Sequence, residues 1–312
     1  MYTCVIVNPA SANGATGRHW PEIRAALDDV LERWDNQFTV APGDATRLAR
    51  EAVEAGYERI ACVGGDGTMN EVVNGLFPAD EAMGIGDAPT KTGLVLASIR
   101  AGTGGDFARY LDLSHKIPEA VAHLKSGKTR TCDLGLVEYV DHDGRPGRRA
   151  FLNIASFGLS GVVVDKVNHS SKALGGKASF MLGVGRAMAS YRRTSVRISV
   201  DGAPLHDGLL VTCAVANGQY FGGGMRFAQN AEIDDGQFDV VVQERTGVKE
   251  VLNVGDLYSG KMAQWDSVNT RRGVTVEAES SDRVLLDVDG EQPGRLPAKF
   301  TLVPGPVQVQ VP

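Results

Sequence analysis

An apolar run that breaks into a glycine-rich turn and then opens a helix is the most constraining feature of the chain. Residues 60–75 read IACVGGDGTMNEVVNG, so the break falls at Gly64-Gly65-Asp66-Gly67-Thr68. Glycines allow backbone to approach a ligand closely, and the helix N-terminus that follows presents unpaired N–H groups that suit phosphate oxygens. The pattern predicts an α/β unit with a phosphate site at this turn. An ordinary strand-to-helix turn capped by Asp66 has the same outline.

The first 127 residues repeat this alternation of short apolar strands and amphipathic helices. We therefore expect a parallel sheet covered by helices on both faces, forming an α/β domain over residues 1–127. The strands are predicted at 3–7, 37–40, 59–63 and 93–98, and the helices at 21–34, 44–55, 69–77, 106–111 and 118–125.

The pattern changes beyond Ser126-Gly127-Lys128, where short β-branched runs are separated by Asp-Gly and Pro-Gly pairs. Such pairs are typical of turns between antiparallel strands. Helical stretches interrupt this pattern at 161–191 and 248–258. Residues 128–312 are thus predicted to form an antiparallel β-sandwich domain for the substrate, with the active site in the interdomain cleft.

The composition of the chain limits which partners and which cellular compartment we expect for the protein. Residues 1–127 hold 11 Lys+Arg against 17 Asp+Glu, and the remainder holds 21 against 21, so no nucleic-acid partner is expected. Cys4, Cys62, Cys132 and Cys213 are widely spaced in apolar runs, as buried free thiols in a reducing compartment are. No signal peptide or membrane-spanning run is evident. We expect a cytoplasmic protein and leave a homodimer open.

Four polar or glycine-rich loops follow the four predicted strands of the first domain. They begin at Asn8, Thr39, Gly64 and Ala101. Because the carboxyl ends of parallel strands meet at one edge of the sheet, the loops are expected to converge on one site. The chain contains neither GxxxxGK[ST] nor GxGxxG, which disfavours P-loop NTPases and Rossmann dinucleotide enzymes.

Together these motifs resemble the diacylglycerol kinase catalytic family, which includes soluble bacterial lipid kinases and the sphingosine and ceramide kinases. The resemblance covers nearly the whole chain and rests on NPASANG at 8–14, GGDGTMNEVVNG at 64–75, GTGGDFAR at 102–109 and DVDGE at 287–291. It implies ATP and Mg²⁺ as cofactors and a lipid hydroxyl as phosphate acceptor. By matching positions it implies nucleotide contacts at Asn8, Thr39, Gly64, Gly65, Asp66, Gly67, Thr68, Asn70, Glu71 and Thr103.

The chain departs from the family pattern in the fourth loop. Arg100 stands where the family usually has proline, and Gly105 stands where it has asparagine. The missing amide removes hydrogen-bonding capacity near the expected phosphates, so a catalytically weak lipid- or nucleotide-binding regulator is one alternative. A soluble-substrate kinase such as NAD kinase, which shares a similar GGDGT loop, is the other.

A cluster of acids near the C-terminus supplies the expected proton chemistry. Asp287, Asp289 and Glu291 lie so close in sequence that each raises the pKa of the others unless a cation or donor intervenes. A solvated Asp-Gly hairpin turn is the plain alternative. The resemblance makes Glu291 the general base that accepts the proton of the lipid hydroxyl, with Asp289 supporting it. Asp66 is the competing candidate for that base.

Two further segments carry predictions. The Asp-Gly turn at 235–236 resembles a structural Mg²⁺ loop of the bacterial branch, in which Asp235 supplies a carboxylate and Glu232 and Gln237 supply backbone carbonyls; a plain turn is the alternative. The stretch from Lys166 to Arg197 contains basic and apolar residues but no acid. This stretch predicts transient peripheral contact with an anionic membrane surface. The alternative is a helix whose apolar face belongs to the core and whose cations are solvated.

Overall fold

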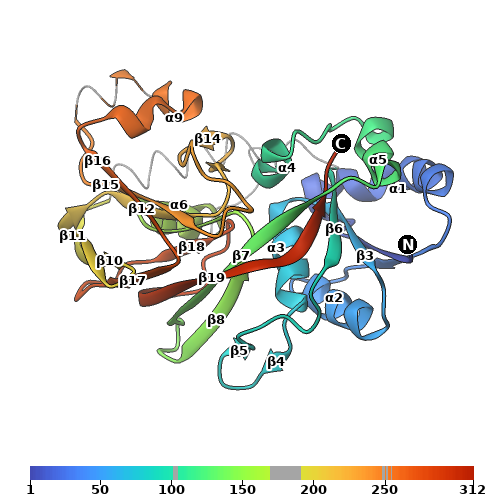
Figure 1. Cartoon of the computed structure of the whole chain (residues 1–312), viewed down its shortest axis with the longest axis horizontal. Coiled ribbons are helices and arrows are strands. Elements are labelled where there is room, and N and C mark those ends of the chain that lie inside the picture. Colours follow the sequence, from blue (N-terminus) through green and yellow to red (C-terminus); the bar gives the residue numbers. More distant parts are fainter. Residues whose placement is uncertain (101–104, 169–190, 248–249, 251, 254) are drawn as a thin grey trace.

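The N-terminal half contains a parallel sheet in the order β6-β3-β1-β2 (Figure 1). The computed structural model describes residues 1–100, 105–168, 191–247, 250, 252–253 and 255–312. The four strands are β1 (Thr3–Val7), β2 (Trp34–Phe38), β3 (Arg59–Gly64) and β6 (Leu94–Arg100).

Helices cover both faces of this sheet, because alternate residues of each strand point to opposite sides. In β1, Val5 packs with residues of α1 and α5, whereas Ile6 packs with residues of α2 and α3. The expected parallel sheet with two buried faces is confirmed. The helices are α1 (Ser11–Val30), α2 (Asp44–Glu54), α3 (Asp66–Gly75), α4 (Asp106–Tyr110) and α5 (Ile117–Ser126).

Two predicted elements of this half were wrong in position. Trp34, expected at a helix end, begins β2, which pairs with β1 alone and is partly exposed, so it lacks a clear apolar run. Helix α1 begins at Ser11 rather than at residue 21. Residues 12–14 adopt left-handed backbone angles before the regular helix, and Pro21 lies inside that helix without ending it.

The C-terminal half is an antiparallel sandwich, as predicted. One five-stranded sheet has the order β16-β15-β12-β9-β18 and packs against strands of the large sheet through an apolar core that includes Phe151, Phe157 and Phe300. The small-sheet strands are β9 (Ile154–Gly158), β12 (Thr212–Ala216), β15 (Phe238–Gln243), β16 (Val268–Gly273) and β18 (Leu286–Val288). The facing strands are β7 (Thr129–Val140), β8 (Pro146–Phe151), β10 (Thr194–Val200), β11 (Ala203–Leu210), β17 (Thr275–Glu279) and β19 (Arg295–Gln310).

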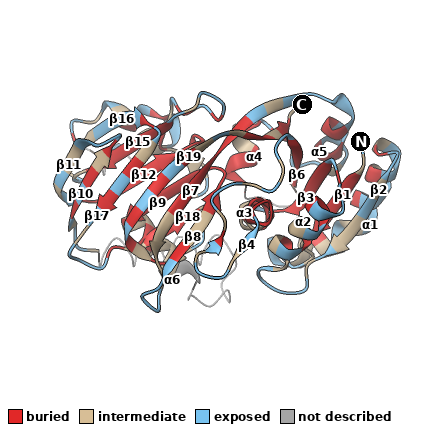
Figure 2. Cartoon of the chain, turned by 60° about the horizontal axis from the view of Figure 1, so that its bottom comes forward, coloured by how far each residue is buried: buried red, intermediate tan, exposed pale blue. Residues whose placement is uncertain are grey.

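One long strand joins the two halves into a continuous sheet. β19 pairs antiparallel with β7 along its length and with β17 near its start, and it pairs parallel with β6 near its end, where Val307 lies opposite Leu94. Figure 2 shows buried residues running along this connection between the two halves. The domain limits at 127 and 128 remain a prediction, because β7 and β19 are shared by both halves.

The remaining described elements are short. They are β4 (Ala79–Asp80), β5 (Gly84–Ile85), α6 (Leu159–Asn168), β13 (Tyr220–Phe221), β14 (Met225–Arg226), α9 (Asp256–Ser259) and η2 (Lys261–Gln264). Much of the predicted helix at 161–191 and of the basic stretch lies outside the described residues, as does part of 248–258.

The four cysteines are free and buried, as expected, and burial raises the pKa of each thiol. Among the described residues, no helix combines the length and apolar character that crossing a bilayer requires.

Candidate active site

The glycine turn opens the carboxyl edge of the parallel sheet to a ligand. A Cβ on Gly64 would lie 2.8 Å from Oγ1 of Thr68, so this position tolerates only glycine. A Cβ on Gly65 would meet nothing within 4 Å, and Gly65, the N-cap of α3, has no side chain that could cap the helix. Within the described residues the first N–H groups of α3 have no side-chain partner, as an anion-binding helix N-terminus requires.

The loops after β1 and β2 lie at the same edge. Asn8 donates from Nδ2 to Oγ1 of Thr68 at 2.9 Å, which ties the first loop to the glycine turn. Thr39 directly follows β2 and donates its backbone N–H to the carbonyl of Val7 at 2.9 Å. Thr103 lies outside the described residues. Three of the four expected loops thus meet at one edge.

Of the fourth loop, the structure describes Gly105, which is the N-cap of α4. Gly105 has a left-handed φ of 114°, and a Cβ there would lie 3.4 Å from Nε of Arg100. The two departures from the family pattern are therefore neighbours, and the glycine fits a backbone conformation that other residues rarely adopt.

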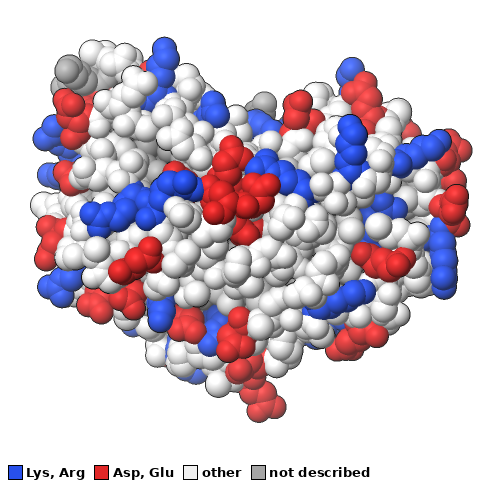
Figure 3. All heavy atoms as spheres, in the orientation of Figure 1, with Lys and Arg blue, Asp and Glu red and all other residues white. Residues whose placement is uncertain are grey.

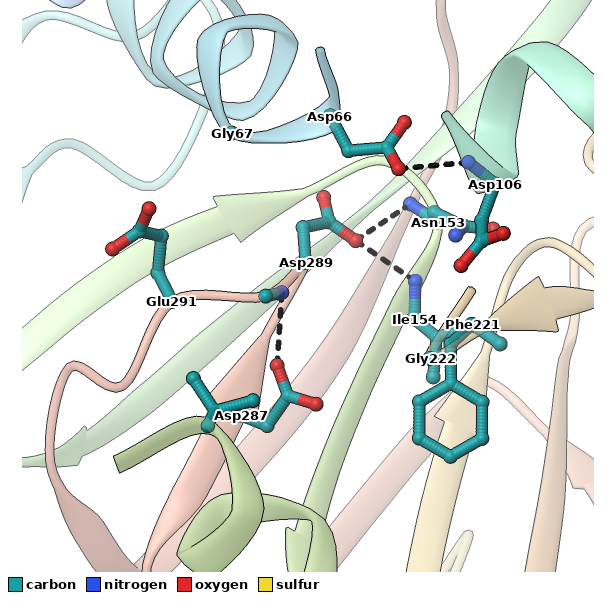
Figure 4. A pocket seen from close by; sticks show the side chains of 12 residues that line it. Asp66, Gly67, Asp106, Asn153, Ile154, Phe221, Gly222, Asp287, Asp289 and Glu291 are labelled. Atoms are coloured by element: carbon teal, nitrogen blue, oxygen red, sulfur yellow. Dashed lines mark hydrogen bonds between the residues drawn. The ribbon is translucent and has the colours of Figure 1, made fainter. Parts of the chain in front are cut away.

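A cavity of about 270 Å³ lies between the two halves of the molecule (Figure 4). Among the described residues, five carboxylates line it and no Lys, Arg or His does; Ile154, Val164 and Phe221 provide apolar surface. The lining residues are Asp66, Gly67, Asp106, Asn153, Ile154, Val164, Phe221, Gly222, Asp287, Asp289, Gly290 and Glu291. The sequence predicted three of these acids, Asp66, Asp289 and Glu291, to be catalytic.

Asp66 and Asp106 form the side of the pocket that belongs to the N-terminal half. The backbone N–H of Asp106 donates to Oδ2 of Asp66 at 2.7 Å. Burial, reinforced by the nearby carboxylates of Asp106 and Asp289, raises the pKa of Asp66 to about 6, even though that hydrogen bond opposes the rise. Asp106 also accepts a hydrogen bond from the N–H of Gly223 at 2.9 Å and pairs with Arg109.

The opposite side is a tight hairpin turn at the end of β18. Val288 and Glu291 exchange backbone hydrogen bonds of 2.8 and 3.0 Å, and Asp289 and Gly290 between them both have positive φ. The plain reading of Asp-Gly as a hairpin turn is therefore correct for the backbone. The side chain of Asp289, however, points into the protein, so the turn also delivers a carboxylate to the pocket.

Four donors hold the carboxylate of Asp289. Its Oδ1 accepts from the N–H groups of Asn153 and Ile154, and its Oδ2 accepts from Leu152 N–H and Asn70 Nδ2, over 2.8–3.1 Å. Burial nevertheless raises its pKa. With its lone pairs engaged in this way, Asp289 is suited to hold the turn in place.

The two other acids of the turn differ in exposure. Asp287 is 5% exposed, accepts from Gly290 N–H at 2.8 Å and Ser156 Oγ at 3.1 Å, and has a pKa that burial raises to about 7. Glu291 is exposed, and its side chain makes no hydrogen bond within the described part of the chain. Its Oε1 lies 3.4 Å from where a Cβ on Gly67 would stand, so it reaches the first turn of α3.

Two predicted nucleotide contacts are engaged elsewhere. Glu71 accepts from the N–H groups of Gly43 and Ala45 at 3.0 and 3.1 Å and thereby caps α2. Asn70 is 1% exposed and faces the C-terminal half, where it contacts Asp289. The helical position of both residues was correct, but the direction of their side chains does not favour phosphate contact.

The predicted metal loop is compensated by arginines. Asp235 pairs with Arg272, and Glu232 accepts from Arg130 at 2.5 Å and from Tyr110 Oη at 3.0 Å. Figure 3 shows acidic and basic side chains side by side on one face of the molecule. Across the described ranges, no three His, Cys, Asp or Glu side chains are arranged to hold a metal ion. The ligand set Asp235, Glu232 and Gln237 stays a prediction.

The sequence placed Asp287 in the acid cluster without giving it a role, and it gave no role to Asp106 or Asn153. Asp106 could have been found as the first acid after a glycine run. Asn153 carries no local signal, because it enters the pocket only through the turn between β8 and β9.

Comparison with known proteins agrees with the fold and the motifs. Residues 2–137 match the diacylglycerol kinase catalytic domain, and residues 153–311 match the YegS C-terminal NAD kinase beta sandwich-like domain. Diacylglycerol kinase from Bacillus subtilis is 29% identical over 95% of this chain and 91% of its own length; that from Staphylococcus carnosus is 26% identical over 99% and 94%.

Solved structures show the same architecture. A diacylglycerol kinase from Bacillus anthracis has a TM-score of 0.72 at 23% identity, covering all of this chain and 97% of its own. An NAD kinase from Archaeoglobus fulgidus in complex with ATP is more distant, with a TM-score of 0.51 at 14% identity over 99% of this chain and 93% of its own. The two domain matches together span most of the sequence, and the chain is thus a kinase that belongs to the bacterial diacylglycerol kinase family.

Proposed function

We propose that this kinase uses ATP and Mg²⁺ to phosphorylate the hydroxyl of a neutral lipid such as diacylglycerol. The observation that carries the proposal is that a phosphate-binding helix N-terminus and a carboxylate able to accept a proton lie at the same cavity. The open N-terminus of α3 supplies amides for phosphates, and Glu291 from the other half comes close to Gly67 of the same turn. Phosphoryl transfer needs mainly this alignment of donor and acceptor with charge stabilisation.

The nucleotide side is assigned to the carboxyl edge of the parallel sheet. The backbone of Gly64–Thr68 and the side chain of Asn8 lie at the N-terminal end of α3, and Thr39 follows β2 at the same edge of the sheet. Thr103 is kept in this set on the family pattern alone. Asn70 and Glu71 act indirectly: Asn70 donates a hydrogen bond to Asp289, and Glu71 caps α2.

The donor set of the pocket suits Mg²⁺. The ion is usually held in kinases by one or two carboxylates together with phosphate oxygens and water, so the lack of a three-carboxylate cluster among the described residues is compatible with it. Asp66 and Asp106 would hold it with the nucleotide. When bound, it neutralises the charge of the phosphates.

Glu291 is the proposed general base, and Asp289 fixes the turn that carries it. Glu291 is exposed and unengaged by hydrogen bonds in the described chain, so it is free to accept the proton of an incoming hydroxyl. Asp66 already accepts a hydrogen bond from Asp106 and, with a pKa of about 6, is partly protonated near neutrality. These features favour Glu291 as the base, with Asp66 at the nucleotide side.

The charge of the pocket argues against a soluble anionic acceptor such as NAD. The described residues that line the cavity include five carboxylates and no cation, so a pyrophosphate at the acceptor position would meet like charge. A neutral hydroxyl with apolar chains beside Ile154 and Phe221 fits better.

ATP consumption in mixed micelles tests the function. We expect turnover with diacylglycerol, and none with NAD or with phosphatidylglycerol, which offers hydroxyls beside a phosphate. Turnover that requires NAD would replace the proposal by the soluble-substrate kinase. Absence of turnover with every lipid of a total extract, despite MgATP binding, would favour a binding regulator.

A lipid acceptor requires access to a bilayer, so we also propose transient membrane contact of a cytoplasmic enzyme. The support is the basic composition of residues 166–197. The combined change of Lys172, Lys177, Arg186 and Arg192 to Glu should abolish binding to anionic vesicles at low salt while leaving MgATP binding intact. Unchanged vesicle binding would refute it.

A further inference from the structure

Asn70 is a buried amide with every polar atom engaged. It is 1% exposed, and its Nδ2 donates to Oδ2 of Asp289 and to the carbonyl of Ala150, both at 3.0 Å. Its Oδ1 accepts from Nε and Nη2 of Arg149 at 3.0 and 2.6 Å. No donor or acceptor is left for a nucleotide.

Arg149 determines which way the amide of Asn70 points. A guanidinium group has donors and no acceptor, so the oxygen of the amide must face Arg149 and its NH₂ must face Asp289. The direction of the Asn70–Asp289 hydrogen bond is therefore fixed by chemistry.

Asn70 connects the two sides of the pocket. Within the described chain, Asp289 receives three of its four donors from Leu152, Asn153 and Ile154 of its own half, and the fourth from α3. The same helix begins at Asp66 and Gly67, which line the pocket opposite the turn.

We propose that Asn70 is a positioning residue for the phosphoryl transfer: oriented by Arg149, it holds Asp289 and so sets the place of Glu291 relative to the first turn of α3. This inference rests on the proposed function, in which Glu291 is the base. It assigns to Asn70 a role across the domain boundary, distinct from contact with the nucleotide.

Asn74 provides a matched control on the same helix face. Its Oδ1 accepts from the N–H of Ala150 at 2.9 Å, and its Nδ2 donates to the carbonyl of Ala150 at 3.0 Å. The same Nδ2 also donates to the carbonyl and to Oδ1 of Asn70 at 2.8 and 3.1 Å. Like Asn70 it is buried and docks α3 on β8, but it is not among the described residues that donate to the carboxylate of Asp289. Asn70 keeps both of its hydrogen bonds from Arg149 when Asn74 is truncated. A role in docking the helix is shared by both asparagines, whereas a role in positioning Asp289 belongs to Asn70 alone.

The test compares Asn70→Ala with Asn74→Ala in the full-length enzyme. We expect both to lower Tm by similar amounts, while kcat falls at least tenfold further in Asn70→Ala, with the KM for ATP unchanged. A ¹³C NMR titration adds a readout without activity. The pKa of Asp289 should rise in Asn70→Ala and stay unchanged in Asn74→Ala, because only the former loses a donor to the carboxylate.

Asn70→Asp gives a sharper signature. It replaces a donor by a second carboxylate facing Asp289, so kcat should fall most at pH 8 and recover toward the wild-type value at pH 5–6, where one proton bridges the pair. Equal kcat in the two alanine variants, or an unchanged Asp289 titration in Asn70→Ala, would overturn the proposal. If the wild-type enzyme phosphorylates no lipid, the proposed function is refuted instead. The NMR titration of Asp289 would still decide whether Asn70 holds its carboxylate.

Discussion

Two acid-rich regions of the molecule differ in how their charge is compensated. In the surface cluster Glu232, Asp234 and Asp235, the carboxylates contact Arg130 or Arg272. In the pocket, five carboxylates line one cavity, none of the described lining residues is a cation, and of the five only Asp106 pairs with an arginine, Arg109. The sequence makes the two regions look alike, since each is a group of acids around an Asp-Gly pair.

The pKa shifts follow this difference. Hydrogen bonds from Arg130 lower the pKa of Asp234, whereas burial raises that of Asp66 to about 6 and that of Asp287 to about 7. Uncompensated carboxylates are the ones available to bind cations or exchange protons near neutral pH. The contrast indicates that charge compensation, and not the density of acids, separates a reactive site from a structural one.

The largest effect expected from this contrast is on turnover. Glu291→Gln removes the proposed base while keeping its size, so kcat should fall by about 10²- to 10⁴-fold with MgATP affinity, measured by calorimetry, nearly unchanged. Asp234→Asn is the matched control from the surface cluster and should keep wild-type kcat. Comparable losses in both variants would break the contrast.

A second prediction concerns stability and its pH dependence. Because the pKa of Asp287 is about 7 in the folded state against an ordinary 3.8, the folded state binds more protons between these values, and stability falls as pH rises through that window. Asp287→Asn keeps an oxygen that accepts from the N–H of Gly290 and places an NH₂ group against Oγ of Ser156, which can accept from it, but the substitution removes the charge. It should stabilise the protein by on the order of 3 kcal/mol at pH 8 and by little below pH 4.

Denaturant unfolding at several pH values measures this effect. A gain for Asp287→Asn that is the same at pH 4 and pH 8 would show that the side chain is not an uncompensated acid.

The pH profile of the wild type sharpens the comparison further. Asp66 has a pKa of about 6, and its ionised form is the one that can hold a cation. As pH falls below 6, kcat/KM should drop about tenfold per pH unit. A profile that is flat between pH 5 and 8 would mean that Asp66 need not be ionised in the free enzyme.

The smallest effect belongs to the surface cluster. Asp234 and Arg130 are each about one third exposed, so Asp234→Asn should change the free energy of unfolding by only about 0.2–1 kcal/mol, less at high salt. A loss well above 2 kcal/mol would mean that this ion pair is integral to the fold.

Much of the fold could be predicted because its signals are local. The glycine turn after β3 and the Asp-Gly pairs encode backbone geometry within a few residues, and both kinds of turn are where the sequence places them. β2 was misplaced because an edge strand with partly exposed polar residues has no apolar run to detect.

The site was less predictable because its side chains are oriented by distant contacts. Asn70 lies in a motif whose family role suggested phosphate contact, yet its direction is set by Arg149 and Asp289, far away in sequence. Likewise the arginines that compensate Glu232 and Asp235 come from β7 and β16. Pairings of this kind depend on tertiary packing and leave no pattern in the local sequence.

The pairing of β19 with β6 has a consequence for synthesis on the ribosome. Until residues 307–309 emerge, the backbone groups of β6 that they will occupy have no partner on that side. The N-terminal half therefore completes its sheet only after residues 307–309 have been translated, and an exposed strand edge must be protected from association with other chains during that interval.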